Sequence, residues 1–589
     1  MAWLSGTLLF SVALALNMRV LDFGFLYLRD DDINVTLNPH MGGVDLGRLK
    51  WMFTDWSYVR RYIPLGWLNF SATYQVAGLD PVPYHAVALL LYLLNCVLVL
   101  VLVLHALRLF APAGLGGLTA WDAGAACLAA GWWAFSPMRV ETTAWVSGNL
   151  YGQSMALLFA SLIAYLRTYR ARGGRRTAWL CLAAAAYAAS LLTYPLALGV
   201  PFLLVGLDWL RSRGGDGPTF RRLLAEKAAF ILPLAAVLAV TVAARLGAAE
   251  VYGAVPGMLE SPLLTRAAQS AYVAAYYVWK PWWPAHLSPL YDTLVGFNPA
   301  GPVFLASMAA VAAASVLSLL ALRTRPVLAV VWFGYLAAAA PFFGLTERNH
   351  MASDRYGYFL AAIAAAALAA ALSRAATARS RIVALAASLA VLGALCRLTA
   401  RQLDSWTDDR VQHAYVAAHL TNPELLDDFN SRLEILEFMR GNEGAAEAAV
   451  SAALARNPSS PGFQKAATMF ADKRKVDSFY GQASFLAILQ DQMGLRFARA
   501  GEYREANDHF EDALRMDERF YQAAYDRALV LLDLGRARDA LGSYLIARRW
   551  ASPALPRAQV AGFLGRLESV AEAEGDTPLA GAARRALAR

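Results

Sequence analysis

The stretch AVALLLYLLNCVLVLVLVLHALR, residues Ala86–Arg108, decides the fold class of this chain. It contains no acidic residue, and its single arginine stands at its very end. A membrane-spanning helix needs about 20 predominantly apolar residues, and this stretch meets that length. The whole chain of 589 residues is 58% hydrophobic and only 16% charged, whereas soluble domains carry about 25% charged residues. These features predict an all-α, polytopic membrane protein.

The same length criterion, applied along the chain, predicts eleven spans in a membrane domain of residues 1–397. They lie near residues 2–18, 86–108, 121–137, 149–167, 178–193, 195–211, 226–245, 302–322, 326–343, 356–373 and 381–397. A further segment, residues 265–283, is interrupted by Gln269, Lys280 and Pro281 and is rich in Trp and Tyr. Aromatic-rich amphipathic segments prefer the membrane interface, so we expect this one to lie on the membrane surface.

The basic residues of the short loops fall on one side of this arrangement. Cytoplasmic loops carry an excess of Lys and Arg, and the arginine-bearing loops here alternate along the chain, at residues 167–176, 211–227, 323–325 and 374–381. This pattern predicts a cytoplasmic N-terminus and an external C-terminus. A cleaved signal peptide is the alternative for the first segment, since Ala13-Leu14-Ala15 resembles a cleavage site, but Met1–Ser5 lacks the expected positive charge.

From residue 398 the composition changes and an internal repeat appears. Gly494, Phe497, Gly501, Tyr503, Ala506, Phe510 and Ala513 recur 34 residues later as Ala528, Leu531, Gly535, Ala537, Ala540, Tyr544 and Ala547. A degenerate earlier unit contains Gly441, Ala446, Ala453, Asn457 and Pro458. This is the period of tetratricopeptide repeats (TPR). We therefore expect residues 398–589 to form a soluble TPR-type solenoid on the outer face, where its groove would bind a protein or peptide.

The predicted topology brings four loops to the outer face, at residues 19–85, 136–149, 246–301 and 344–355. The first contains three consecutive carboxylates, Asp30, Asp31 and Asp32, and ionisable residues beside a bilayer are a functional-site hypothesis by default. The four loops together supply acids, bases and aromatic residues. A carboxylate can take a proton from a hydroxyl acceptor, and guanidinium groups can hold a phosphate.

Four segments also carry a family resemblance. They are the run Asp30–Thr54; Pro64-Leu65-x-Trp67-Leu68-x-Phe70 leading to Gly78-Leu79-Asp80-Pro81-x-x-Tyr84-His85; Val140-Glu141-x-x-Ala144-Trp145-Val146-Ser147-Gly148; and Ala352-Ser353-Asp354-Arg355-Tyr356. In order and spacing they resemble bacterial TMTC-like proteins, which combine a transmembrane domain with TPR units. That family belongs with the GT-C glycosyltransferases and is similar in plan to protein O-mannosyltransferases.

The resemblance implies transfer of a sugar from a polyprenyl-phosphate donor to a hydroxyl acceptor, on a protein Ser or Thr or else on a glycan or lipid. Asp31 or Asp32 would be the catalytic base, and Glu141 a second carboxylate. The donor phosphate would be held by Arg355, with Arg348 or Lys280 assisting. The expected substrate-lining residues are Asp30, Asn38, His40, Arg61, Trp145, Asn149, Tyr291 and Asp354. No cofactor or metal ligand set is required, although three adjacent aspartates leave room for a divalent cation.

The chain departs from the family pattern at three places. It has Ser136-Pro137-Met138-Arg139 in place of His-Pro-x-His, Gly148-Asn149-Leu150-Tyr151 in place of Gly-Arg-x-Asp, and Ile63 in place of an arginine. These departures favour the alternative of a catalytically inactive, membrane-anchored TPR scaffold. They also keep structural interpretations open, in which Glu141 pairs with Arg139 or another base and Asp354-Arg355 forms a helix cap with a salt bridge. A third hypothesis is a transporter of lipid-linked sugars, but the sequence shows no inverted hydropathy repeat of the kind found in many transporters.

The net charge of +9 comes from short loops between apolar segments, so it does not indicate nucleic-acid binding. The chain is rich in Ala and Arg and poor in Lys, which suggests a GC-rich bacterial genome. We therefore expect a multi-pass protein of the bacterial inner membrane with its TPR region in the periplasm. The endoplasmic-reticulum lumen is the eukaryotic equivalent of that face.

Overall fold

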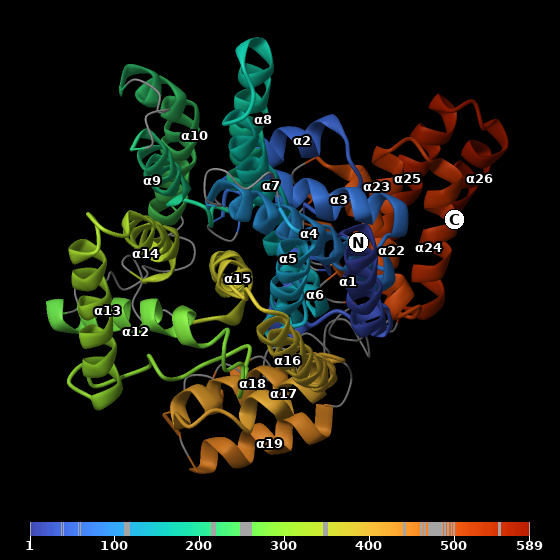
Figure 1. Ribbon diagram of the computed structural model, residues 1–589. Helices are drawn as coiled ribbons and strands as arrows, with labels where there is room; N and C mark the ends of the chain where they lie inside the picture. The colour runs from blue at the N-terminus through green and yellow to red at the C-terminus, as the bar shows by residue number, and fades with distance from the viewer. Residues whose placement is uncertain are drawn as a thin grey trace. The chain divides into compact units, whose positions relative to one another are not determined.

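The computed structural model describes residues 2–36, 38, 40–56, 58, 61–110, 118–213, 220–247, 262–344, 352–439, 443–456, 501–551, 555 and 557–587, with isolated residues between 458 and 498. Across these ranges the regular structure is helical, without a β-strand (Figure 1), which confirms the all-α prediction for this part of the chain. The chain divides into two compact units. The first comprises Met1–Thr36 with Gly43–Asn422, and the second Leu37–Gly42 with Pro423–Arg589.

The α-helices of the first unit include one in each predicted apolar segment and several outside those segments. They are α1 (Ala2–Asn17), α2 (Leu46–Thr54), α3 (Pro64–Ala77), α4 (Pro81–Phe110), α5 (Ala120–Ala134), α6 (Val140–Ala144), α7 (Asn149–Thr168), α8 (Gly173–Thr193), α9 (Val200–Ser212), α10 (Phe220–Gly247), α12 (Leu263–Trp279), α13 (Pro302–Leu320), α14 (Pro326–Ala339), α15 (Gly357–Leu372), α16 (Ala378–Asp404) and α17 (Asp409–Ala417). The predicted domain boundary after residue 397 falls inside α16.

Six helical segments among the described residues are long and apolar enough to cross a membrane. They belong to α4, α7, α10, α13, α15 and α16. Each of the eleven segments predicted from sequence contains a helix, but the other five are shorter or more polar than these six. The structure therefore supports membrane character, and the count of eleven spans stays a prediction. The segment expected on the membrane surface contains α12, which ends at Trp279.

Helix α7 begins at the site described below and is packed against α4 and α8. Small polar residues line its contact with α8. The hydroxyl oxygens of Ser154 and Ser190 lie 3.0 Å apart, and the Ser161 hydroxyl donates to the Ala183 carbonyl at 2.7 Å. Small residues of this kind let helix backbones approach closely, and their hydroxyls bond across the contact. This packing holds the middle of α7 against α8.

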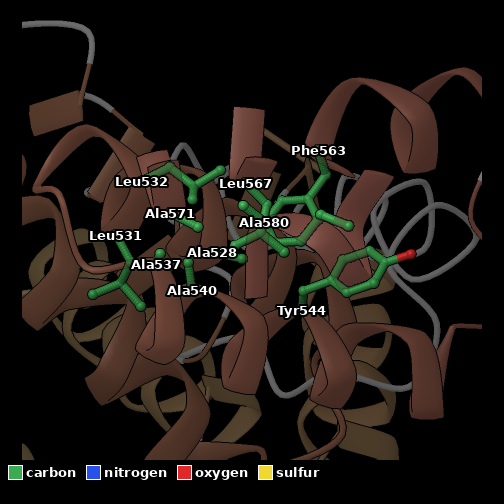
Figure 2. Close-up of a cluster of buried hydrophobic side chains, with 11 residues drawn as sticks. Ala528, Leu531, Leu532, Ala537, Ala540, Tyr544, Phe563, Leu567, Ala571 and Ala580 are labelled. Carbon is green, nitrogen blue, oxygen red and sulfur yellow. The ribbon is translucent and has the colours of Figure 1, made fainter. Parts of the chain in front are cut away.

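The regular structure described in the second unit is helical. They are α18 (Pro423–Met439), α19 (Glu443–Arg456), α22 (Tyr503–Met516), α23 (Tyr521–Asp533), α24 (Ala537–Trp550), α25 (Arg557–Ala573) and α26 (Thr577–Leu587). Figure 2 shows the buried cluster that α23, α24, α25 and α26 share. In it the rings of Tyr544 and Phe563 are stacked 4.3 Å apart, while Ala528, Ala537 and Ala540 supply the small positions.

A recurrent glycine turn separates the helices of the second unit. Gly501, Gly535 and Gly575 have φ angles of 79°, 69° and 78°, a region that glycine adopts without steric cost. The residue after each glycine donates its backbone N–H back to the carbonyl of Phe497, Leu531 or Ala571, at 3.0, 2.8 and 2.8 Å respectively. This hydrogen bond is typical of a Schellman helix end. The first two turns follow the predicted 34-residue period, and Gly575 comes later than that period would place it.

Candidate functional site

The three consecutive aspartates lie in an irregular turn that sends their carboxylates in different directions. Asp30 follows a short 3-10 turn, Tyr27–Arg29, and has a left-handed φ of 68°. A short π-helical turn, Asp32–Thr36, follows at once. Asp and Asn tolerate the left-handed region better than most residues, so this sequence can reverse direction here. As a result Asp31 points into the protein and Asp30 points toward Arg61.

Asp31 is completely buried and its carboxylate is fully engaged by the protein. One oxygen accepts hydrogen bonds from the backbone N–H and the hydroxyl of Ser147, at 2.8 and 2.6 Å, and the other accepts from the Leu26 N–H at 2.8 Å. Burial raises the pKa of Asp31 to about 7, although these hydrogen bonds oppose the shift. This aspartate therefore ties the first loop to the turn that precedes α7.

Asp32 is in a different situation, because within the described residues only backbone groups donate hydrogen bonds to its carboxylate. Burial raises its pKa to about 6; the Ile33 backbone opposes this shift, and the negative charges of Asp30 and Asp409 add to it. A carboxylate with a pKa near 6 is well matched to a general base that works near neutral pH. Of the two aspartates predicted as the base, Asp32 has the more suitable environment.

Arg61 lies opposite the aspartate turn. Its guanidinium contacts the Asp30 carboxylate at 3.2 Å and the Asn34 side-chain oxygen at 3.4 Å. Its charge also lies close enough to the hydroxyls of Tyr151 and Tyr194 to interact with them electrostatically. The Arg61 side chain keeps 29% of its surface exposed, so this cation is bordered by polar groups while remaining accessible.

A second cation, Arg355, is bound by Glu141. The Arg355 Nη1 atom donates to one Glu141 oxygen at 2.5 Å, and the Arg355 backbone N–H donates to the other at 2.8 Å. The Glu141 side chain is only 5% exposed and that of Arg355 is 18% exposed. Of the interpretations left open by the sequence, pairing of Glu141 with a base is thus the one found here, and the base is Arg355.

Aromatic rings surround the Arg355 guanidinium. It lies 5.6, 5.5 and 4.8 Å from the ring centres of Trp145, Tyr151 and Tyr356, distances at which cation–π attraction operates. Its Nε atom donates to the Tyr151 hydroxyl at 3.1 Å, whereas its Nη2 atom makes only a 3.5 Å contact with the Tyr356 hydroxyl. Tyr151 is therefore a neighbour of both cations, Arg61 and Arg355.

Asp354 and Lys280 form a third part of the site. The Asp354 carboxylate accepts hydrogen bonds from the hydroxyls of Tyr276 and Tyr291, at 2.7 and 2.9 Å. The Lys280 Nζ atom donates to the Ala285 carbonyl at 2.8 Å and lies over the ring of Tyr276 at 5.4 Å. Burial lowers the pKa of Lys280, and the nearby Asp354 charge opposes that shift. Asp354 and Arg355 are adjacent in the chain, so this part of the site borders the aromatic rings that surround Arg355.

The remaining predicted residues make contacts of other kinds. The Trp145 indole N–H donates to the Arg29 carbonyl at 2.6 Å, which fastens the turn before α7 to the aspartate turn. Asn149 donates to the Tyr84 carbonyl at 3.1 Å. Asn38 and His40 belong to the second unit, where the His40 N–H donates to the Asn38 side chain at 2.9 Å. Arg348 lies outside the described residues.

Several residues at this site were not predicted from the sequence to act there. They are Ser147, Tyr151, Tyr194, Tyr276 and Asp409. A usable signal existed for Tyr194, since Tyr194-Pro195 interrupts an apolar run and proline ends the preceding helix. Arg139 is also buried beside the site, and its guanidinium has no hydrogen-bond partner within the described residues. It lies instead over the rings of Trp133 and Tyr358, at 5.1 and 4.8 Å.

Within the part of the chain that the structure describes, no group of three His, Cys, Asp or Glu side chains is arranged to hold a metal ion. Comparisons of the chain with protein-family models, with curated proteins and with solved structures find no match. The site thus combines a buried carboxylate that has a raised pKa with two guanidinium groups near Tyr151. Several aromatic rings surround one of these guanidinium groups.

Proposed function

We propose that this protein is a membrane glycosyltransferase of the GT-C type, which transfers a sugar from a polyprenyl-phosphate donor to a hydroxyl acceptor. The observation that carries the proposal is the neighbourhood of Tyr151, whose hydroxyl accepts from Arg355 at 3.1 Å and also interacts electrostatically with the charge of Arg61. Two guanidinium groups in the vicinity of one tyrosine suit a phosphate, which arginine binds through paired N–H donors. Asp30, the partner of Arg61, is also the charge that acts on Asp32.

In this mechanism the acceptor hydroxyl attacks the anomeric carbon of the donor sugar. The bond between that carbon and the phosphate oxygen breaks, polyprenyl phosphate leaves with the electron pair, and Asp32 takes the hydroxyl proton. A single displacement of this kind inverts the configuration of the sugar. The Nη2 edge of Arg355, whose contact among the described residues is a long one to the Tyr356 hydroxyl, would bind the leaving phosphate together with Arg61.

The other carboxylates have positioning roles in this proposal. Glu141 holds Arg355 by its guanidinium and its backbone N–H at once, so it sets the direction of the phosphate-binding edge. Asp31 is buried and accepts hydrogen bonds from Leu26 and Ser147, so it holds the aspartate turn against the segment that leads into α7. The aromatic rings about Arg355 would provide a surface for the sugar.

The number of membrane spans, their topology and the assignment of TPR units are part of the same proposal. Eleven membrane spans would place the aspartate turn and the TPR region on one outer face, the periplasm of a bacterium. Helical pairs and repeated glycine turns in the second unit agree with TPR units. Their groove would deliver a protein acceptor, with a glycan or lipid acceptor as the alternative.

The test is a comparison of two aspartate variants from the same loop. Purified protein in proteoliposomes is incubated with polyprenyl-phosphate sugars extracted from host membranes and with host acceptor proteins, and released polyprenyl phosphate is measured by mass spectrometry. We expect Asp32→Asn to lower the rate by about 10²- to 10⁴-fold, the usual contribution of a general base. Asp22→Asn is the matched control, because Asp22 is exposed and ends the short helix Met18–Asp22.

A second candidate function, a membrane-anchored scaffold without catalysis, is favoured by one observation. Two of the three predicted catalytic carboxylates, Asp31 and Glu141, already have protein donors on both of their oxygens. If wild-type protein releases no polyprenyl phosphate while partner proteins co-purify with wild type and Asp32→Asn alike, the scaffold is the better description. Full activity of Asp32→Asn would instead remove Asp32 from its role as base.

A further inference from the structure

A pocket of about 660 Å³ lies at the far end of α7 from the candidate site. Its lining comes from the carboxyl-terminal ends of α4 and α7, the start of α8 and the end of α9. Six of the lining residues are arginines and none is acidic: Arg108, Arg167, Arg170, Arg172, Arg175 and Arg211. The 20 residues of α7 correspond to about 30 Å of helix, so the pocket and the candidate site are separated by roughly the thickness of a bilayer core.

Among the described residues, two carboxylates close to this pocket, those of Asp208 and Glu226, already have partners. Asp208 accepts hydrogen bonds from the Tyr165 and Tyr169 hydroxyls, at 2.6 and 2.7 Å, and pairs with Lys227 at 2.5 Å. Glu226 pairs with Arg176 and with Arg222, at 2.6 and 2.9 Å. Within the described residues, none of the six pocket arginines forms an ion pair with a carboxylate. The pocket therefore concentrates positive charge that the described part of the chain does not neutralise.

Two of the pocket arginines are held in place by aromatic rings. Arg167 lies 4.7 Å from the ring centre of Trp179, and Arg211 lies 4.6 Å from that of Tyr169 while donating to the Tyr169 carbonyl at 3.0 Å. Arg170 and Arg175 are exposed at the pocket rim. Trp is enriched at membrane interfaces, so the indole of Trp179 suits a position at the headgroup level. The pocket thus combines two guanidinium groups that lie over aromatic rings with further exposed ones.

We infer that this pocket binds the phosphate headgroup of an anionic membrane lipid. Helices α4 and α7 are both long and apolar enough to cross a membrane, so a pocket at their ends lies where lipid headgroups are found. Like charges gathered without counter-charges repel one another, and a phosphate would remove that cost. Basic pockets between membrane helices on the cytoplasmic side are suited to such headgroups. The inference is independent of the glycosyltransferase proposal.

The experiment is native mass spectrometry of the full-length protein released from detergent micelles, with lipids added in competition. Phosphatidylglycerol supplies a phosphate with net negative charge, phosphatidylcholine supplies a phosphate without it, and inorganic phosphate supplies the anion without a membrane anchor. We expect wild type to retain phosphatidylglycerol over phosphatidylcholine. The variant Arg170→Gln/Arg175→Gln should weaken that retention by roughly tenfold or more, since each basic residue near an anionic headgroup contributes about 1 kcal/mol.

The matched control is Arg323→Gln/Arg325→Gln, which removes the same charge from an exposed turn outside the pocket. It should leave retention unchanged. Equal retention of both lipids by wild type, or equal losses in the two variants, would overturn the proposal. Displacement of phosphatidylglycerol by inorganic phosphate at the same concentration would assign the pocket to a soluble anion instead of a lipid. Because the first comparison uses only wild-type protein, it does not depend on how the variants fold.

Discussion

Asp31 and Ser147 are 116 residues apart in the chain, yet one Asp31 oxygen accepts both the backbone N–H and the hydroxyl of Ser147, at 2.8 and 2.6 Å. The Ser147 hydroxyl also accepts from the Asn34 side chain at 2.9 Å. This pair therefore joins the aspartate turn to the segment that leads into α7. It explains how a loop with few regular elements can present Asp32 in a fixed position.

The first prediction concerns this link. Ser147→Ala removes one of the three donors to a buried carboxylate, and hydrogen bonds to charged groups contribute about 1.5–3 kcal/mol. We expect the variant to be destabilised by about that amount, as a lower apparent melting temperature in detergent. The control is Ser212→Ala, whose hydroxyl is exposed at the end of α9 and should matter by less than about 0.5 kcal/mol. Equal melting temperatures for the two variants would contradict the role given to Ser147.

The second prediction is a pH dependence of sugar transfer. A base must be deprotonated to act, and burial raises the pKa of Asp32 to about 6. The transfer rate should therefore rise tenfold per pH unit below about pH 6 and level off above it. An unshifted aspartate, with a pKa of about 3.9, would be active well below pH 5. The check is the pH profile of polyprenyl phosphate release at saturating donor.

If the rise in rate below about pH 6 is absent from an Asp32→Asn protein with residual activity, the ionisation is that of Asp32. If the rise persists in that variant, the ionisation belongs to another group.

The third prediction addresses the pair of Glu141 and Arg355. Breaking a buried ion pair from one side leaves an uncompensated charge and costs about 3–5 kcal/mol, whereas replacing both partners costs much less. We expect Glu141→Gln and Arg355→Met each to lower the apparent melting temperature strongly, and the double variant to lose less than the sum of the two. A double-mutant cycle measures this coupling. Additive losses would mean that the bidentate contact at 2.5 and 2.8 Å contributes little.

The helical fold could be predicted from the sequence because apolar length and internal period are local properties. Every predicted apolar segment contains a helix, and the glycines of the repeat end helices where the period places them. The partners within the site could not be predicted in the same way. The choice between Asp31 and Asp32 depends on Ser147, and the partner of Glu141 depends on Arg355, 214 residues away. Arg139, a possible partner by sequence proximity, lies over aromatic rings instead.

The last prediction compares two glycines of the second unit that differ in backbone conformation. Gly535 has a φ of 69° at the turn between α23 and α24, and alanine in that region costs about 1–2 kcal/mol. Gly542 lies within α24, where a Cβ would meet open space, and alanine is favoured over glycine in a helix by about 1 kcal/mol. Gly535→Ala should therefore destabilise the α23–α24 pair, and Gly542→Ala should stabilise it.

Hydrogen exchange of the α23 and α24 backbone amides, followed by mass spectrometry, measures the local opening free energy directly. Exchange should become faster in Gly535→Ala and slower in Gly542→Ala. A change of the same sign in both variants would show that the glycine turn does not fix the end of α23. In that case the hydrogen bond from the Arg536 N–H to the Leu531 carbonyl would not be the element that sets the repeat.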